Sequence, residues 1–376
     1  MKRVCVVITA RPSYSRVYSV LKALRARHDV RLQIIAAASA LVTRYGRIVD
    51  QIRADGFEVS AEIPSVVEPD GLRESAVSTG LLLSQMAGIL GALKPDVVVT
   101  VADRHETIAT AIAAAYQHIP LCHLLGGEET GSIDDKVRHA ITQLADIHCV
   151  ATQTAGVRVS RATENKAQVH VTGCPSIDLA AEALRLGPLP CSDVVVLQHS
   201  VTNEADQAGE QMRQTIEALR GMDVTWFWPG EDAGGQAMVK EMRLAGLHPI
   251  RNRPPIEFLR MLLGCKVLVG NSSGGLREGS FLGVPVVNIG SRQEGRERGG
   301  NVVWSSHDPQ AIRSMVKDWL ELPGRVAPRS TLYGDGHAGE RIAAILADQE
   351  WLGSKREEAS FSTDIRDIMN RPWENR

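Results

Sequence analysis

The chain is a repeating series of short apolar runs and longer helical patterns. The apolar runs are continuous and rich in β-branched residues, which is typical of strands buried on both faces of a sheet. In the first part of the chain they cover residues 4–9, 30–36, 96–101 and 120–125. Helical patterns cover residues 14–27 and 106–117. Strands that alternate with helices in this way predict a parallel sheet with helices on both faces.

The same pattern starts again after residue 186. The sequence Gly-Pro-Leu-Pro at residues 187–190 resists both helix and strand and is a candidate linker. Beyond it, strands are predicted at residues 194–197, 223–228, 245–251, 266–270 and 284–289, with a helix at residues 255–263. We therefore expect two α/β domains, residues 1–186 and 191–354, whose strand ends face a shared cleft. Residues 355–376 form a charged tail of helical character that could pack back on the first domain.

Composition narrows the class of protein. A chain of 376 residues is long for one domain, and its hydrophobic content of 44% is enough for real cores. A net charge of −2 without a basic block, together with 4% aromatic residues, argues against a nucleic-acid partner. The six cysteines are scattered, which is typical of free thiols in a reducing compartment. There is no run of 18 apolar residues and no signal-peptide pattern, so we expect a soluble cytoplasmic protein without a membrane span.

The most informative segment is residues 270–301. An apolar run ends there in a Gly/Ser turn containing Ser272, Ser273 and Gly274, and a helix is predicted to begin at this turn. The first N–H groups of a helix are unpaired and carry about half a positive charge, so such a turn can cradle a phosphate. Glu278 follows one turn later, where it could accept hydrogen bonds from a ribose, and Arg292 comes after the next predicted strand. This predicts a nucleotide diphosphate site; the alternative is an ordinary strand–turn–helix beside a solvated arginine loop.

Polar residues also follow the predicted strands of the first domain. The carboxyl ends of parallel strands share one edge, so Arg11, Asp103 and the loop at residues 126–135 should lie together. Asp103 is a candidate catalytic carboxylate, or else a helix N-cap. The segment GGEETGSIDDKVRHAITQLADIH, which begins with this loop, supplies Glu128, Asp134 and Arg138. Asp134 and Arg138 are four residues apart on a helix, where they could be an acid/base and a clamp, or only a surface ion pair.

His199 ends a predicted core strand of the second domain, where it could titrate, contact a phosphate or simply be a hydrogen-bonded structural histidine. The chain contains neither H-E-x-x-H nor C-x-x-C, and no metal spacing is evident in its acidic cluster. It also lacks a G-x-S-x-G elbow and a G-x-x-x-x-G-K-[ST] loop, which disfavours serine hydrolase and P-loop chemistry.

Taken together, these segments resemble a known family. ITARPSYSR, VADRHE, GGEETGSIDDKVRHAITQLADIH, VTGCPSID, LQHSVTNE, WPGEDAG and the segment 270–301 follow one another as in UDP-N-acetylglucosamine 2-epimerases. The likeness covers roughly residues 1–350. It is greatest to the hydrolysing branch, which makes N-acetylmannosamine for sialic-acid-type sugars, because of the sequence NIGSRQEGRERG.

The resemblance implies a GT-B fold of two facing Rossmann-like domains, with UDP and a UDP-sugar as ligands, no cofactor, and a homodimer or homotetramer. Matching motifs assign the nucleotide and its phosphates to Arg11, Ser272, Ser273, Gly274, Glu278 and Arg292. They place Asp103, Glu128, Asp134, Arg138 and His199 around the sugar. The implied reaction removes the C2 proton and expels UDP, and water then adds to the 2-acetamidoglucal with inversion at C2. Which of the three carboxylates is the base stays open.

Three residues depart from the family pattern and leave the identity of the sugar open. They are Leu125, where the family often has a polar or acidic residue, Ser200, where proline is usual, and Gly230, where asparagine is usual. Three alternatives therefore remain. One is a non-hydrolysing epimerase, in which UDP is added back. The others are a glycosyltransferase, whose turnover needs an acceptor, and a catalytically silent nucleotide-sugar sensor.

Overall fold

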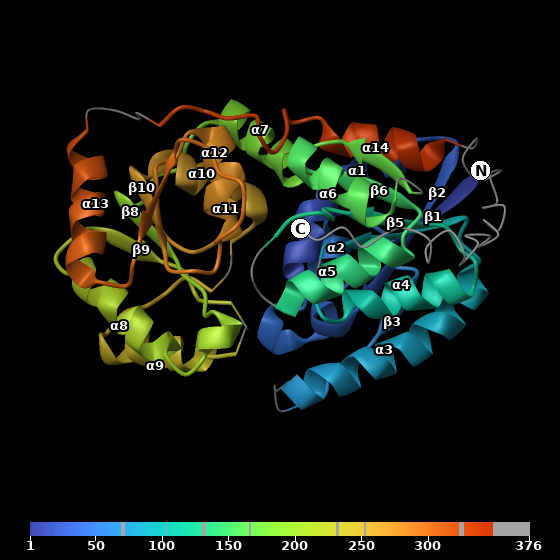
Figure 1. The fold of residues 1–376 in the computed structure, drawn as a ribbon, viewed down its shortest axis with the longest axis horizontal. Helices are drawn as coiled ribbons and strands as arrows, with labels where there is room; N and C mark the ends of the chain where they lie inside the picture. The colour runs from blue at the N-terminus through green and yellow to red at the C-terminus, as the bar shows by residue number, and fades with distance from the viewer. Residues whose placement is uncertain are drawn as a thin grey trace, which may run out of the picture.

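The computed structural model describes residues 1–68, 72–102, 104–129, 133–164, 167–230, 233–251, 253–322 and 327–348. It contains two parallel sheets, each in its own half of the molecule (Figure 1). The seven-stranded sheet has the order β3-β2-β1-β4-β5-β6-β7, and the five-stranded sheet has the order β12-β11-β10-β8-β9. The predicted fold class, two Rossmann-like α/β units, is confirmed.

The strands coincide with most of the apolar runs. The first sheet consists of β1 (Lys2–Ile8), β2 (Val30–Ala37), β3 (Ala61–Ile63), β4 (Val97–Val101), β5 (Leu121–Leu124), β6 (Ile147–Val150) and β7 (Gln168–Val171). The second consists of β8 (Val194–Leu197), β9 (Val224–Trp226), β10 (Val267–Gly270), β11 (Val286–Ile289) and β12 (Val302–Ser305). Every residue of β4, β5, β10 and β11 is buried, as expected for strands covered on both faces.

Helices cover both faces of each sheet. The first half contains α1 (Arg11–Arg25), α2 (Ile48–Ala54), α3 (Leu72–Leu93), α4 (Thr107–Tyr116), α5 (Ile133–Leu144), α6 (Gln153–Ala162) and α7 (Ser176–Leu186). They are followed by α8 (Ala208–Ala218), α9 (Gly235–Leu244), α10 (Pro255–Gly264), α11 (Ser273–Leu276), α12 (Glu278–Leu282), α13 (Pro309–Glu321) and α14 (Ala338–Ala347). Helix α1 begins three residues earlier than predicted, because Pro12 is accommodated in the first turn of a helix.

The strand predicted at residues 245–251 is wrong. Helix α9 ends at Leu244, and the next three residues close it by donating back to its last carbonyls. Gly246 has a φ of +71°, which a strand does not allow. In the part of the chain that the structure describes, a single bridge between Phe227 and Ile250 continues the edge of the sheet beside β9. Ala245 and Leu247 therefore belong to a helix end, and the sheet pairing of the segment is limited to Ile250.

Helix α14 lies in the range predicted for the second domain but packs on the first half. It contacts α1, and its residues Ile342, Ala343 and Leu346 belong to the same buried cluster as β1 and α1. Figure 1 shows α14 beside α1, with the preceding chain passing back from the second half. The predicted domain ranges stay a prediction, and the tail at residues 355–376 lies outside the described residues.

Among the described helices, only the one at residues 73–93 is long and apolar enough to cross a membrane, judged by length and composition alone. Core helices of soluble proteins pass the same test. The inner side of α3 carries Leu82, Met86 and Leu90, which are fully buried in a cluster with α4 and the sheet. Its outer side exposes Val77 and Leu81. Helix α3 thus packs with its inner side on α4 and on one face of the first sheet.

Candidate functional site

The Gly/Ser turn after β10 is formed as predicted and begins a helix. Ser272 is the N-cap of α11, and its Oγ accepts a hydrogen bond from the Gly274 N–H at 3.3 Å. Gly270 precedes this turn with a φ of +137°, a conformation that side chains rarely adopt. The helix is short: it is interrupted at Arg277, so that Ser273 starts α11 and Glu278 starts α12.

Two further predicted nucleotide-binding residues lie around the same turn. Glu278 places its Oε2 in a buried position, and this oxygen has no hydrogen-bond partner among the described residues. A Cβ added to Gly274 would lie 3.5 Å from that oxygen, so carboxylate and turn are adjacent. Arg292 donates to the main-chain oxygen of Asn271 at 3.3 Å from the loop after β11. The structure therefore brings Ser272, Gly274, Glu278 and Arg292 together.

His199 is held beside this turn by main-chain and side-chain hydrogen bonds. Its N–H donates to Asn271 Oδ1 at 2.7 Å, and its carbonyl accepts from Asn271 Nδ2 at 2.9 Å. The ring Nδ1 accepts from the Gly230 N–H at 2.8 Å, so this nitrogen carries no proton. Asn271 thus joins the ends of β8 and β10. His199 therefore has a structural function, since its hydrogen bonds link the chain after β8 to Asn271 and Gly230. Contact of His199 with the sugar stays a prediction.

On the first half, the described residues among those predicted lie at the carboxyl ends of β1 and β5 and on α5. Arg11 begins α1 and is exposed at this edge. Arg138 of α5 is fully buried and donates to the main-chain oxygen of Glu128 at 2.6 Å. Its ion pair is with Asp135 rather than the predicted Asp134, because the carboxylate three residues earlier faces its guanidinium. Asp134 is also on α5. Asp103 lies outside the described residues.

Leu125, one of the departures from the family pattern, is buried in the apolar core. Its side chain is 2% exposed and belongs to the cluster that also contains Val101 and Cys149. Its φ of +65° is unusual for a residue with a side chain. Its N–H donates to the main-chain oxygen of Cys149 at 2.9 Å. This position therefore supplies no polar group at the end of β5.

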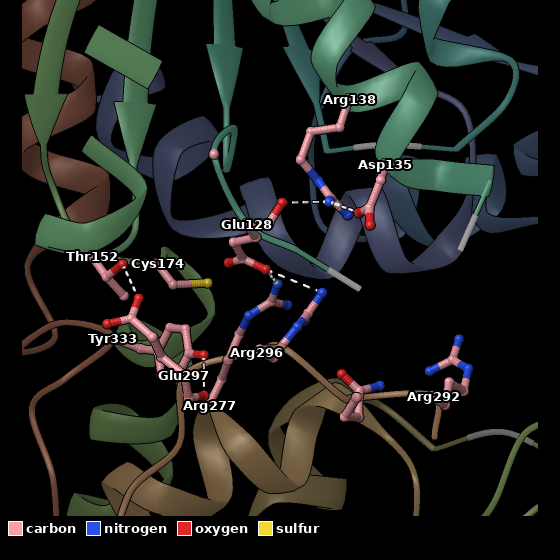
Figure 2. A network of polar contacts seen from close by, with 12 residues as sticks. Glu128, Asp135, Arg138, Thr152, Cys174, Arg277, Arg292, Arg296, Glu297 and Tyr333 are labelled. Carbon is pink, nitrogen blue, oxygen red and sulfur yellow. Dashed lines mark hydrogen bonds and ion pairs between the residues drawn. The ribbon is translucent and has the colours of Figure 1, made fainter. Parts of the chain in front are cut away.

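The two halves meet at a buried cluster of charges around Glu128 (Figure 2). Glu128 extends from the loop after β5, and its Oε2 forms ion pairs with Arg277 and, at 3.1 Å, with Arg296. Both arginines belong to the second half. The exposed fractions are 5% for Glu128, 3% for Arg277 and 9% for Arg296. Charges buried to this degree are stable only when paired, so the pairs fix how the two halves meet here.

Neighbouring contacts also cross between the halves. Glu297 accepts hydrogen bonds from the hydroxyl groups of Thr152 and Thr154 in the first half. The Tyr333 hydroxyl donates to the Glu297 carbonyl, and Figure 2 shows these residues beside Arg277. Cys174 lies in the same region, and burial raises the pKa of its thiol, so that it stays protonated.

Burial alone would raise the pKa of Glu128. The charges of Arg277, Arg296 and Arg138 outweigh this effect and hold the pKa at about 2, against an ordinary value of 4.5. Because the folded pKa is lower than the unfolded one, this carboxylate stabilises the fold above about pH 4.5. The stabilisation is lost as the pH falls toward 2.

We therefore expect the Glu128→Gln variant to be less sensitive to acid than the unmodified protein. Between pH 4.5 and 2 the unmodified protein should lose on the order of 3 kcal/mol more unfolding free energy than the variant. Urea unfolding at a series of pH values measures this difference. Glu129→Gln, at the exposed neighbouring position, is the matched control. Equal acid sensitivity of Glu128→Gln and the unmodified protein would contradict the prediction.

Sequence analysis singled out Glu128 but did not identify Arg277 as its partner. Arg277 lies within GGLREGS, which is typical of a helix surface, and Glu128 is 149 residues away. Among the described residues, no group of three His, Cys, Asp or Glu side chains could hold a metal ion. The arrangement is thus a polar junction of arginines, carboxylates and a helix-capping turn, formed between two α/β halves.

Solved structures with this architecture define the class as the GT-B fold. One is the UDP-GlcNAc 2-epimerase of Neisseria meningitidis bound to UDP-GlcNAc, with a TM-score of 0.77 and 19% identity; the match covers 92% of this chain and 99% of that one. Another is the Methanocaldococcus jannaschii enzyme in complex with UDP-GlcNAc and UDP, with a TM-score of 0.77, 18% identity and the same coverage. At these identities the likeness shows the fold alone.

The sequence itself shows the family. The model of the family UDP-N-acetylglucosamine 2-epimerase matches residues 22–347. A hydrolyzing UDP-N,N'-diacetylbacillosamine 2-epimerase of Legionella pneumophila is 31% identical over 92% of this chain and 96% of its own. A UDP-N-acetylglucosamine 2-epimerase of Neisseria meningitidis is 26% identical over 93% of this chain and 96% of its own. The chain belongs to the UDP-N-acetylglucosamine 2-epimerase family and is an enzyme of that family.

Proposed function

We propose that the protein is a hydrolysing 2-epimerase. It eliminates UDP from a UDP-2-acetamido sugar and adds water to the product with inversion at C2, giving N-acetylmannosamine or a related 2-acetamido sugar. The observation that carries this proposal is the junction described above, where Arg277, at the end of the capped helix α11, and Arg296 pair with Glu128 in the loop after β5. The names of two relatives, the Legionella enzyme and a Campylobacter jejuni GDP/UDP-N,N'-diacetylbacillosamine 2-epimerase (hydrolyzing), 25% identical, support it.

The chemistry has two requirements. A C2–H of a sugar is a poor acid, so the leaving group at C1 must be stabilised while a base removes the proton. We assign the nucleotide and its diphosphate to Arg11, Ser272, Ser273, Gly274, Glu278 and Arg292. Arginines and N–H groups preorganised at the diphosphate stabilise the charge that develops as the C1–O bond breaks. We place Asp103, Glu128, Asp134, Arg138 and His199 around the sugar, with a carboxylate as the general base.

The experiment that tests this function is an NMR time course in D2O with UDP-N-acetylglucosamine and, separately, UDP-N,N'-diacetylbacillosamine. We expect UDP to accumulate with a free, C2-inverted sugar that carries deuterium at C2. Accumulation of an inverted UDP-sugar instead would show the non-hydrolysing reaction. Turnover that needs an added acceptor would show a glycosyltransferase. UDP binding without turnover of any UDP-sugar would show a sensor.

Arg292 provides a direct test of the nucleotide assignment. The Arg292→Met variant should bind UDP about tenfold more weakly, because one charge-assisted contact to the diphosphate is lost. Isothermal titration with UDP measures the change, and titration with uridine should show little difference. Equal UDP affinities for the variant and the unmodified protein would show that Arg292 does not bind the nucleotide.

We also propose a cytoplasmic homodimer or homotetramer that associates without membrane or nucleic acid. The outer side of α3 supports association, since it exposes Val77 and Leu81 and carries no charged residue from 75 to 93. Leu81→Arg should shift the protein toward monomer in sedimentation velocity, because a charge would be desolvated at the contact. Leu244→Arg, at an exposed leucine of α9, is the control. A monomeric unmodified protein would end this proposal.

A further inference from the structure

The two oxygens of the Glu128 carboxylate have different surroundings. Oε2 is paired with Arg277 and Arg296 of the second half. Oε1 is buried and has no hydrogen-bond partner among the described residues. A buried acceptor without a donor costs free energy, so a hydrogen-bond donor that is not part of these residues should complete the site.

The position of Glu128 is fixed from both ends. Arg138 donates to its main-chain oxygen at 2.6 Å. The preceding Gly127 is locked against α6, since a Cβ there would lie 2.3 Å from the Ala155 oxygen. At the other end, Arg277 and Arg296 hold Oε2, as Figure 2 shows. Oε1 is therefore a preorganised acceptor at the junction of the two halves.

The kind of ligand group follows from the chemistry of an ionised carboxylate. A phosphate offers oxygen atoms and negative charge, both of which the Glu128 oxygen repels. A 2-acetamido sugar offers hydroxyl and amide N–H donors. The two arginines also neutralise the carboxylate, so that a diphosphate can bind nearby. The sugar is thus the part of the ligand that suits Oε1.

We propose that Glu128 binds a hydroxyl or amide donor of the sugar through Oε1 and does not remove the C2 proton, and that Arg277 is the positioning residue that holds it in place. This inference rests on the proposed function. A carboxylate that shares its charge with two guanidinium groups through Oε2 is a weak base at Oε1 as well, which leaves Asp103 and Asp134 as candidate bases. Glu128 instead sets the orientation of the sugar relative to them.

The experiment uses the full-length protein and compares Glu128→Gln, Arg277→Met, Arg277→Lys and the double variant Glu128→Gln/Arg277→Met. Steady-state kinetics with the UDP-sugar, deuterium incorporation at C2 and the affinity for UDP alone are measured for each. Arg220→Met is the matched control, because Arg220 forms an exposed ion pair with Glu217 at 2.6 Å. The unmodified protein is assayed first, so that failure of the proposed function is seen separately as absence of turnover.

We expect Glu128→Gln and Arg277→Met each to lower kcat/KM about 10- to 100-fold, the loss of one charge-assisted contact. UDP affinity should stay within about twofold, and the remaining turnover should still place deuterium at C2. Because Arg277 acts through Glu128, the double variant should be no slower than the slower single variant, and Arg277→Lys should recover part of the rate.

Three results would overturn the proposal. Loss of C2 exchange by more than about 1000-fold in Glu128→Gln, with binding retained, would make Glu128 the base. Weaker UDP binding in Arg277→Met would place Arg277 at the diphosphate. Multiplying effects in the double variant would show that the two residues act independently.

Discussion

Replacing Arg138 by methionine is expected to lower the free energy of unfolding by about 3–5 kcal/mol and to reduce turnover by more than about 100-fold. The Arg138 side chain is fully buried, pairs with Asp135 and donates to the Glu128 carbonyl. Methionine fills a similar volume but removes the donor of the buried Glu128 carbonyl and the ion pair with the partly buried Asp135. Turnover should fall because the loop that carries Glu128 loses its anchor.

Urea unfolding and UDP-sugar kinetics measure these effects. Arg158→Met is the matched control: Arg158 pairs with Glu129 at 2.7 Å, but its side chain is 34% exposed. An exposed pair contributes about 0–1 kcal/mol, so this control should be nearly as stable as the unmodified protein. Equal losses in the two variants would show that burial of Arg138 does not matter.

The Gly270→Ala variant is expected to lose about 3 kcal/mol or more of stability and most of its affinity for UDP. Gly270 has a φ of +137°, and a Cβ would lie 2.2 Å from the Leu197 oxygen of β8. Both atoms belong to paired central strands, so relief requires a shift of backbone. That shift would move Asn271 and Ser272, which form the turn at the proposed nucleotide site.

Thermal unfolding and UDP titration test this prediction. Gly221→Ala is the control, because Gly221 also has a positive φ, +80°, but an added Cβ would meet no atom within 4 Å. It should cost only about 1–2 kcal/mol, the strain of a left-handed alanine. If Gly270→Ala is no less stable than Gly221→Ala, the backbone overlap is not the determining factor.

Sequence patterns predicted those parts of the fold whose structure depends on residues close together in the sequence. Buried strands such as β4 and β10 are continuous apolar runs, and Ser272 caps its helix through a neighbour two residues away. The strand predicted at residues 245–251 is wrong because Ala245 and Leu247, which were assigned to a sheet, close helix α9.

Sequence patterns grouped the residues that share one turn, and they missed the contacts that join distant segments. Arg277 has an ordinary surface-like context in the sequence, and only folding brings it to Glu128. The pairing of Arg138 with Asp135 was missed for a local reason. Helical spacing of three or four residues allows either aspartate, and side-chain direction decides between them.

The return of the chain to the first half has a consequence for how the molecule holds together. The Cys174 N–H donates to the Tyr333 carbonyl at 2.7 Å, and Asp178 accepts from the first N–H groups of α14. The outgoing and returning connections are thus fastened to each other along one border of the molecule. A protease that nicks residues 187–190 would therefore leave both pieces associated, through α14 and through the ion pairs of Glu128 with Arg277 and Arg296.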